Sequence, residues 1–517
     1  MYRSIAKGIP RIAALFALAQ VALHLLTADN LGFHRDEFLY LSLGRQLDWG
    51  YWSNGPLIGV ISWLSQHLFG NSLLATRVFP ALAGGIVVLL SGLMVRDWGG
   101  GRFAQLLNGT VMFCSLAWLR AFGMLQPVAF DILFWALLSW ALFKWLKTND
   151  IRWWRWIGLF AGIGFLNKYS VGFWAIGLLP ALLLTERRTI LASRHPWMAA
   201  LWAVVLIFPN IWWQWHYHFP VVGHMRELAA SQLVNVRPLN FLLDQLLMHG
   251  PGGALVWIAG LVFLFRAKEM RPYRLLAWHF AAVIAVFLLL NGKSYYTLGL
   301  YPAVIAAGAV SWERMLTKIW SRTVLLAFVV LLALPLLPAG IPLWPAARLK
   351  SYFHWLTYDA GIDAAVRWED GQLHDLPQDF ADMLGWHELA ALTDTAFSRA
   401  GDPQKVLVYC ENYGQAGAVE QLGNPALRPR LVSFADSYRL RVNERLPGEV
   451  NTLIYVNDEL GEDVANLFAD VQKIGEITDP LARERGTTVW LCRQPSSSLP
   501  EFWAKRVGEV KALYGLP

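Results

Sequence analysis

The sequence predicts a polytopic α-helical membrane protein with a soluble α/β domain at its C-terminal end. Of the 517 residues, 56% are hydrophobic and 16% are charged, whereas about a quarter of the residues in a soluble globular chain are charged. Apolar stretches that are long enough, or nearly long enough, to cross about 30 Å of hydrocarbon recur through the first 340 residues. Beyond these stretches, helical patterns alternate with short β-like runs, as in α/β domains.

The net charge of +7 combines two parts of opposite charge, which we separate after Pro345. Residues 1–345 contain 27 Lys and Arg against 12 Asp and Glu, a net +15, and residues 346–517 contain 17 against 25, a net −8. We therefore predict a transmembrane catalytic domain over 1–345 and an extracytoplasmic α/β domain over 346–517. A basic excess in a membrane part is typical of cytoplasmic loops, so no nucleic-acid partner is predicted.

Eleven ranges are predicted to span the membrane, with the N-terminus in the cytoplasm. This orientation places 19 basic residues on the cytoplasmic side, from Arg3 and Lys7 onward, and 7 on the outer side, as the positive-inside rule requires. An odd number of spans then places the C-terminal domain outside the cytoplasm. The predicted spans 153–167 and 170–185 are short for full crossings of the membrane. The predicted spans are 11–28, 74–95, 103–122, 127–146, 153–167, 170–185, 196–214, 251–265, 274–291, 295–311 and 323–339.

Two outer segments, 29–72 and 215–250, are too long to be simple turns. Both are amphipathic and rich in aromatic residues, a composition typical of helices that lie in the membrane interface. We expect such helices to roof an outer cavity suited to a lipid substrate.

The α/β domain is predicted from two helical patterns and four apolar β-like runs. No P-loop or GxGxxG motif precedes its helices, so no nucleotide site is predicted. Cys410 and Cys492 could form a disulfide in an oxidising compartment or stay free. The helical patterns are 376–397 and 414–423, and the β-like runs are 405–410, 430–434, 451–458 and 487–492.

Acidic residues are few in the membrane part, which makes the acids at span ends informative. Asp36 and Glu37 are adjacent in HRDEF, just outside the first span. Neighbours on a helix diverge by about 100°, so we expect them to have different roles. A carboxylate there could accept a proton from an acceptor hydroxyl. The alternative is an interfacial pair that is solvated or bridged to Arg35.

Asp131 lies at the outer end of an otherwise apolar span, four residues after Pro127. A charge at this depth needs a partner or an aqueous cavity, and intramembrane acids are functional candidates. We expect it to work with the Asp36 loop, and the alternative is a structural pair with Arg120.

Cations are scarce on the outer side, so Lys168 in GFLNKYS and Lys293 in NGKSYY are candidates for binding an anion. A phosphate-bearing lipid would need such charges, since hydrocarbon cannot stabilise its leaving group. The alternative is that both lysines snorkel to the interface. His216, His218 and His224 form an H-x-H-x5-H pattern, but Pro220 interrupts it and few acids are near, so no metal site is assigned.

Together these motifs resemble the polyprenyl-phosphate-dependent glycosyltransferases of the C type (GT-C). The order is Asp-Glu after the first span, a Trp-rich segment ending in SNGPLIGVISWL, an Asp in the fourth span, and a Lys closing GIGFLNK. The chain is most similar to the bacterial branch of the protein O-mannosyltransferase family (glycosyltransferase family 39-like), which includes the lipid A aminoarabinose transferases. The likeness covers most of residues 30–310.

The resemblance implies the GT-C fold and an inverting transfer of a monosaccharide from a polyprenyl-phosphate donor to an acceptor hydroxyl. The acceptor could be a glycolipid, a polysaccharide or a protein, on the outer face of the bacterial inner membrane, with the C-terminal domain in the periplasm. It also implies that Asp36 is the general base, with Glu37 as its partner, and that Asp131 is the second acid. Lys168 and Lys293, with Tyr295 and Tyr296, would bind the donor phosphate.

One departure concerns the phosphate. Aminoarabinose transferases carry a Lys before the Pro-Pro of the first loop, whereas this chain reads Ser53-Asn54-Gly55-Pro56. The phosphate would then depend on the two lysines or on an arginine such as Arg35 or Arg226, which argues against an aminoarabinose transferase. No cofactor is required by this mechanism, no metal ligand is assigned, and a divalent metal is optional.

Three other functions remain open. The first is a transporter or flippase for a lipid-linked glycan, although the sequence shows no inverted repeat. The second is an oligosaccharyltransferase or ligase that uses a diphosphate-linked donor, which would need more outer cations. The third is a membrane-anchored binding protein whose tail does the work.

Overall fold

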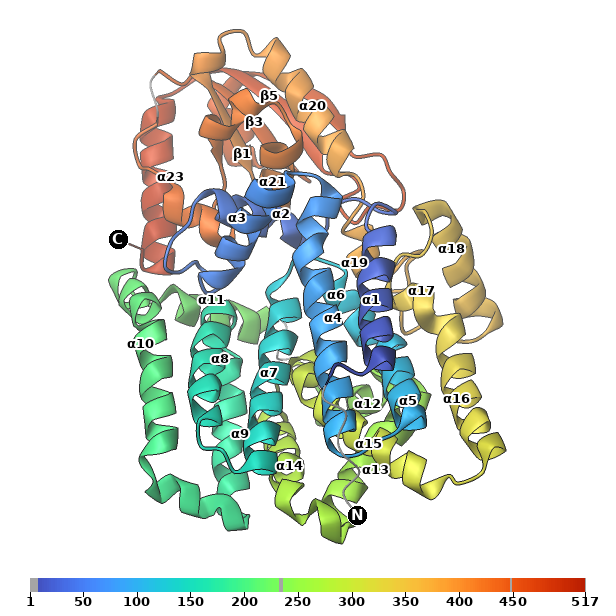
Figure 1. Cartoon of the computed structure of the whole chain (residues 1–517). Helices are drawn as coiled ribbons and strands as arrows, with labels where there is room; N and C mark the ends of the chain where they lie inside the picture. Colours follow the sequence, from blue (N-terminus) through green and yellow to red (C-terminus); the bar gives the residue numbers. More distant parts are fainter. Residues whose placement is uncertain (1–7, 232–235, 447–448, 517) are drawn as a thin grey trace.

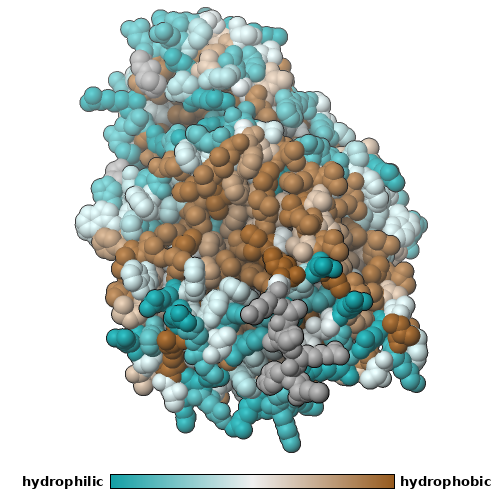
Figure 2. Space-filling model, viewed as in Figure 1, coloured by the Kyte–Doolittle hydropathy of each residue, from teal (hydrophilic) through white to brown (hydrophobic). Residues whose placement is uncertain are grey.

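The computed structural model describes residues 8–231, 236–446 and 449–516. Arg3 and Lys7, which the sequence assigns to the cytoplasmic side, lie outside the described residues. Helices form the lower part of the molecule, and a smaller sheet with its helices caps one end (Figure 1). A band of hydrophobic side chains runs across the middle of the surface, between hydrophilic upper and lower ends (Figure 2). This distribution is that of a protein whose middle faces lipid.

Helices occupy every range predicted to span the membrane. In the first part of the chain they are α1 (Arg11–Leu26), α2 (Arg35–Arg45), α3 (Leu57–Phe69), α4 (Leu73–Asp97), α5 (Arg102–Phe113), α6 (Leu116–Phe122), α7 (Pro127–Thr148), α8 (Trp153–Asn167) and α9 (Val171–Leu183). They continue as α10 (Arg194–His216), α11 (Pro220–Ser231), α12 (Pro238–Leu247), α13 (Gly250–Arg266), α14 (Arg274–Leu289), α15 (Tyr301–Met315), α16 (Ile319–Ala333) and α17 (Leu337–Gly340). The 3₁₀ segments η3 (Lys268–Tyr273) and η4 (Ser294–Leu300) precede α14 and α15.

Five helical stretches among the described residues are long and apolar enough to cross a membrane, or six if α12 and α13 form one span bent by 97°. The other predicted spans are occupied by shorter helices, such as α8 and α9, or by a broken pair, α5 and α6. The multi-pass membrane character is therefore clear, and the count of eleven remains a prediction. The five stretches are Leu73–Asp97, Pro127–Thr148, Arg194–His216, Lys268–Leu289 and Ile319–Gly340.

The C-terminal part contains a mixed five-stranded sheet in the order β2-β1-β3-β5-β4. The strand β1 pairs in parallel with β2 and β3, and β5 pairs antiparallel with β3 and β4. Cys410 on β1 and Cys492 on β5 are buried and free, because β3 lies between their strands. The strands are β1 (Val406–Cys410), β2 (Leu431–Val432), β3 (Thr452–Asn457), β4 (Phe468–Glu476) and β5 (Thr488–Pro495), and the helices are α18 (Ala346–His354), α19 (Gln378–Ala381), α20 (Trp386–Arg399), α21 (Tyr413–Leu422), α22 (Glu462–Leu467) and α23 (Leu499–Tyr514).

The prediction that the outer segment 29–72 lies in the membrane interface is wrong for α2. All residues from Glu37 to Gly44 are buried, because α2 packs between α3 and the helix α21 of the C-terminal part. The helix α3 does expose apolar residues, including Trp63 and Phe69. The C-terminal part thus sits directly on the segment that carries Asp36 and Glu37 (Figure 1).

Candidate active site

The HRDE sequence forms an N-terminal capping box that fixes both acids in the first turn of α2. Nδ1 of the N-cap residue His34 accepts a hydrogen bond from the backbone N–H of Asp36 at 3.1 Å. Oε2 of Glu37 accepts one from the backbone N–H of His34 at 2.9 Å. These bonds satisfy amide groups that the start of a helix leaves unpaired, and the helix dipole stabilises carboxylates there. The two acids therefore share one scaffold, but their surroundings differ.

Glu37 is fully buried and is held by Arg77 of α4. The guanidinium donates to both carboxylate oxygens, at 2.7 Å and 3.1 Å, and the backbone N–H of Leu125 donates to Oε1 at 2.9 Å. Arg77 also donates to the carbonyls of Ala28 and Gly32. The open alternatives of solvation or a bridge to Arg35 therefore do not describe Glu37. Its burial favours a positioning role in place of the catalytic role predicted for it.

Asp36 has one face open, and its side chain is 29% exposed. The hydroxyl of Tyr413, on α21, donates to Oδ1 at 2.7 Å. The side-chain amide of Gln126, the N-cap residue of α7, donates to Oδ2 at 3.1 Å. Both oxygens of the Asp36 side chain therefore accept a hydrogen bond from the protein. The arrangement therefore suits a carboxylate that accepts a proton from a substrate.

Tyr413 remains a neutral donor, because burial and the neighbouring Asp36 carboxylate raise the pKa of its phenol well above the usual value. The guanidinium of Arg35 lies 4.9 Å from the centre of its ring and 4.0 Å from Asp382. Burial disfavours the charged form of Arg35, but the surrounding carboxylates, including Asp382, outweigh it and raise the pKa of the guanidinium. Arg35, predicted as an alternative phosphate ligand, therefore faces the C-terminal part.

Asp131 is buried in the second turn of α7 and is 2% exposed. The hydroxyl of Ser170 donates to Oδ1 at 2.6 Å, and Lys168 attracts the carboxylate electrostatically. The alternative pairing with Arg120 is wrong, since Arg120 pairs with Asp379 at 3.1 Å. Asp131 thus interacts with the segment that carries Lys168 and Ser170. Among the described residues, the structure shows no hydrogen bond between Asp131 and the Asp36 loop.

The predicted phosphate-binding residues form a cluster of cations and aromatic rings. Nζ of Lys168 lies 4.4 Å from the centre of the Tyr296 ring and 5.3 Å from that of Tyr295. Nζ of Lys293 lies 5.9 Å from the Tyr295 ring. The two predicted lysines and the two predicted tyrosines, from two separate stretches of sequence, therefore lie together.

Other predicted residues of the outer face lie apart from this cluster. Arg226, the second alternative for the phosphate, is exposed on α11. Its neighbour Glu227 accepts hydrogen bonds from Trp52 at 3.3 Å and from Arg439 at 3.1 Å, so α11 also contacts the C-terminal part. His216, His218 and His224 do not form a metal-like group among the described residues.

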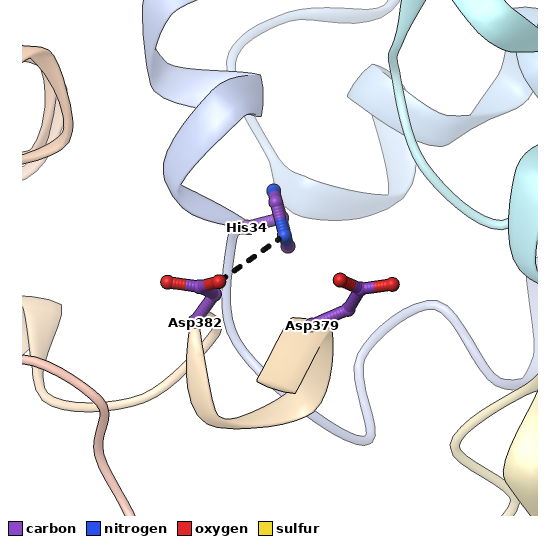
Figure 3. A group of neighbouring side chains, drawn as sticks. All are labelled: His34, Asp379 and Asp382. Atoms are coloured by element: carbon purple, nitrogen blue, oxygen red, sulfur yellow. Dashed lines mark ion pairs between the residues drawn. The ribbon is translucent and has the colours of Figure 1, made fainter. Parts of the chain in front are cut away.

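One group with metal-ligand spacing does occur in the part of the chain that the structure describes. Nitrogen and oxygen atoms of His34, Asp379 and Asp382 lie within 4.8 Å of one another (Figure 3). His34 Nε2 and Asp382 Oδ1 are buried without a hydrogen-bond partner, which would suit a ligand.

The donor set fits a metal ion poorly for two reasons. Nδ1 of His34 accepts from the backbone of α2, so the ring carries a hydrogen on Nε2 and offers no lone pair there. Both carboxylates already pair with arginines, Asp379 with Arg120 at 3.1 Å and Asp382 with Arg483 at 2.9 Å. We interpret the cluster as an ionic contact between the start of α2 and the segment around α19.

Sequence reasoning missed Arg77, Gln126, His34 and Tyr413. Arg77 stands within a predicted span, and an arginine at that depth signals a buried acidic partner. Gln126 directly precedes Pro127, and an N-cap position before a helix-starting proline could have been read from the sequence. No local signal connects Tyr413 with Asp36, which lies 377 residues away.

Comparisons with known proteins agree with the resemblance that the motifs predict. Residues 53–213 match the family model described as dolichyl-phosphate-mannose-protein mannosyltransferase. The matched range contains Asp131 and Lys168 and begins after α2. The family resemblance is thereby confirmed for this region of the chain.

Two curated relatives are similar over about half of the chain. The lipid A galacturonosyltransferase RgtD of Rhizobium johnstonii is 26% identical over 266 residues, which are 49% of this chain and 54% of the relative. The undecaprenyl phosphate-alpha-4-amino-4-deoxy-L-arabinose arabinosyl transferase 2 of Pseudomonas fluorescens is 28% identical over 294 residues, 52% of this chain and 46% of the relative. The chain thus spans about half the length of the curated relatives that it matches.

A solved structure shares the fold over nearly the whole chain. ArnT from Cupriavidus metallidurans, bound to undecaprenyl phosphate, aligns with a TM-score of 0.62 and 14% identity. The alignment covers 92% of this chain and 97% of that structure. The GT-C fold predicted from the motifs is therefore confirmed.

Proposed function

We propose that this chain, which carries a region of the dolichyl-phosphate-mannose-protein mannosyltransferase family, is an inverting glycosyltransferase. It moves a monosaccharide from a polyprenyl-phosphate donor to a hydroxyl of a glycolipid acceptor. The observation that carries the proposal is the combination of a partly exposed Asp36 carboxylate, held by a hydrogen bond on each oxygen, with the cluster of Lys168, Lys293 and two tyrosines. A base and a cationic site for a phosphate are the two groups that this reaction needs.

The proposed topology has eleven spans, with the N-terminus in the cytoplasm of a bacterium and the protein in its inner membrane. Residues 1–345 form the catalytic membrane domain, and residues 346–517 form a periplasmic domain. The distribution of basic residues supports this orientation. Reaction at the outer face follows, since Asp36 and the C-terminal part lie at the same end of the molecule.

The reaction is a single displacement at the anomeric carbon. The acceptor oxygen forms a bond to this carbon while the bond from the carbon to the phosphate oxygen breaks, and the configuration inverts. Asp36 accepts the proton of the acceptor hydroxyl, and the bonding electrons leave with the polyprenyl phosphate. Lys168 and Lys293 stabilise the charge that develops on this phosphate.

Asp131 and Glu37 act through other residues in this mechanism. Asp131 holds Ser170 and attracts Lys168, which keeps the lysine beside the tyrosines. Glu37 and Arg77 anchor the first turn of α2, on which Asp36 stands. The proposed donor lipid and acceptor class are taken from the names of the relatives. Lipid A is therefore the acceptor used in the test.

The proposal is tested with purified full-length protein, lipid A and a panel of undecaprenyl-phosphate-linked monosaccharides. The panel includes 4-amino-4-deoxy-L-arabinose and galacturonic acid, and mass spectrometry detects glycosylated lipid A. Wild-type protein is expected to transfer at least one sugar, and Asp36→Asn is expected to lower the rate at least about 100-fold, the range for loss of a general base. Asp48→Asn, an exposed acid of the same outer segment, is the matched control.

Transfer by Asp36→Asn at near wild-type rate would contradict the assignment of the base. Absence of transfer by wild-type protein with every donor would contradict the function for this acceptor. Mass spectrometry of envelope glycolipids in a deletion strain then identifies whether another glycolipid loses a sugar.

A further inference from the structure

The C-terminal part contacts α2 through one face of α21. Tyr413, Gly417 and Glu420 are spaced by four and three residues and so lie on one side of the helix. Glu420 pairs with Arg45 at the end of α2 at 3.2 Å, and the adjacent Gln421 accepts a hydrogen bond from the same arginine. Tyr413 reaches the first turn of α2, so the two helices contact along their length.

The contact is closer than any side chain at Gly417 would allow. A Cβ atom there would lie 2.5 Å from Cβ of Phe38 and 3.0 Å from its backbone carbonyl carbon. At Gly414 it would lie 3.1 Å from Cβ of Arg35. Glycine at these positions permits close backbone approach. This close approach of the two helices brings the Tyr413 hydroxyl within hydrogen-bond distance of the Asp36 carboxylate.

We infer that Tyr413 is a positioning residue of the active site, through which the C-terminal domain orients Asp36 for proton transfer. The inference rests on the proposed function and assigns a role in it to the C-terminal domain. One donor comes from the membrane domain, Gln126 at Oδ2, and the other from the C-terminal domain, Tyr413 at Oδ1. Only with both in place is rotation of the carboxylate about its last bond restricted from two sides.

The restriction matters because each carboxylate oxygen keeps a further lone pair. With its two oxygens held, Asp36 presents one of these lone pairs in a fixed direction through its exposed face. A base that is held in the productive geometry by hydrogen bonds from a supporting shell reacts faster than one that samples several rotamers. Tyr413 itself is held, since its ring lies under Arg35, which contacts Asp382.

The alternative is that the phenol merely joins the two domains. A purely structural bond would change the thermal stability and donor binding along with the rate. A positioning bond would change the rate of the chemical step alone, because the hydrogen bond and the cation–ring contact of Tyr413 within the described residues go to Asp36 and Arg35, and neither goes to Lys168 or Lys293. The two interpretations therefore differ in measurable quantities.

The experiment compares Tyr413→Phe with Tyr409→Phe in the full-length protein. Both variants lose one hydroxyl from the C-terminal domain, and both hydroxyls donate to a carboxylate, since Tyr409 donates to Glu411 at 3.0 Å. Measured for each are kcat and KM with the donor found active for wild-type protein, the Kd of undecaprenyl phosphate, and the midpoint of thermal unfolding. The Tyr413→Phe substitution keeps the aromatic ring that contacts the Arg35 guanidinium, so the fold should be retained.

For Tyr413→Phe we expect kcat to fall at least about tenfold, the scale for loss of a hydrogen bond to a charged group. KM, the Kd of undecaprenyl phosphate and the thermal midpoint should match those of Tyr409→Phe. Wild-type kcat in Tyr413→Phe would overturn the inference and leave the proposed function intact. A fall in kcat accompanied by weaker binding of undecaprenyl phosphate and a lower thermal midpoint than in Tyr409→Phe would also overturn it. Absence of transfer by wild-type protein would remove the proposed function and the inference with it.

Discussion

The carboxylate side of the candidate site is fixed more tightly than its cation side. Asp36 has a hydrogen-bond donor on each oxygen, and the adjacent Glu37 is buried against Arg77. Lys168 instead lies over the face of a tyrosine ring. An aromatic face attracts a cation without fixing its direction. The difference fits two demands: a base must be oriented before the acceptor arrives, whereas a phosphate is stabilised by nearby positive charge.

The largest expected effect tests whether the buried acid Asp131 belongs to the chemistry. Asp131→Asn keeps an acceptor for the Ser170 hydroxyl but removes the charge that attracts Lys168. We expect sugar transfer to fall at least about 100-fold, the scale for loss of a group that stabilises developing charge, because Lys168 is no longer held at the leaving phosphate. Expression and the thermal midpoint should stay close to wild type. The assay is transfer to lipid A, as for Asp36→Asn. Asp150→Asn, which changes a partly exposed acid that pairs with Arg152, is the control. Transfer at the wild-type rate by Asp131→Asn would show that Asp131 is not essential.

The second effect concerns stability and separates Glu37 from Asp36. Arg77→Met leaves the fully buried Glu37 charge without its partner, which costs about 3–5 kcal/mol in comparable cases. We expect a clear fall in the midpoint of thermal unfolding in detergent. Arg271→Met, which breaks an exposed pair with Glu186, should change the unfolding free energy by less than about 1 kcal/mol. Equal effects of the two substitutions would show that Glu37 is not anchored as the structure has it.

The helices could be predicted from the sequence because each one carries its own signal. A run of apolar residues predicts a helix in lipid regardless of its neighbours, and every predicted span is helical. The strand β4 was missed, since Phe468–Glu476 mixes polar and apolar residues and its pairing with β5 decides its structure. The burial of α2 was also missed, because it depends on where the distant helix α21 docks.

The candidate site likewise combines residues that the local sequence reveals with residues that only tertiary packing brings together. Asp36, Asp131 and Lys168 stand out in the sequence, because charges are rare beside apolar spans. Their partners do not stand out. Arg77 is 40 residues from Glu37 and Tyr413 is 377 residues from Asp36, and a hydrogen bond between such residues is a product of tertiary packing alone.

The third effect concerns the cation side. Lys168→Ala removes the ammonium that lies over Tyr296, and we expect the Kd of undecaprenyl phosphate to rise about tenfold, the scale of one charge-assisted contact. Asp36→Asn should leave this Kd near wild type, since its carboxylate acts on the acceptor. Lys350→Ala, which removes an exposed lysine paired with Asp375, is the control. The same Kd in all three variants would contradict the phosphate role of Lys168.

The smallest effect is expected from chelation of metal ions. If the cation side supplies the positive charge for the leaving phosphate, a divalent metal has no required place in the reaction. The group of His34, Asp379 and Asp382 is a poor alternative source, because its carboxylates pair with arginines and the ring nitrogen that faces them carries hydrogen. Transfer by protein dialysed against EDTA should therefore equal transfer by untreated protein. If dialysis removes the activity and Mg²⁺, Mn²⁺ or Zn²⁺ restores it, the lysines and tyrosines alone do not supply the positive charge that the reaction needs. If the ion then fails to restore activity in Asp382→Asn, the ion binds at this group.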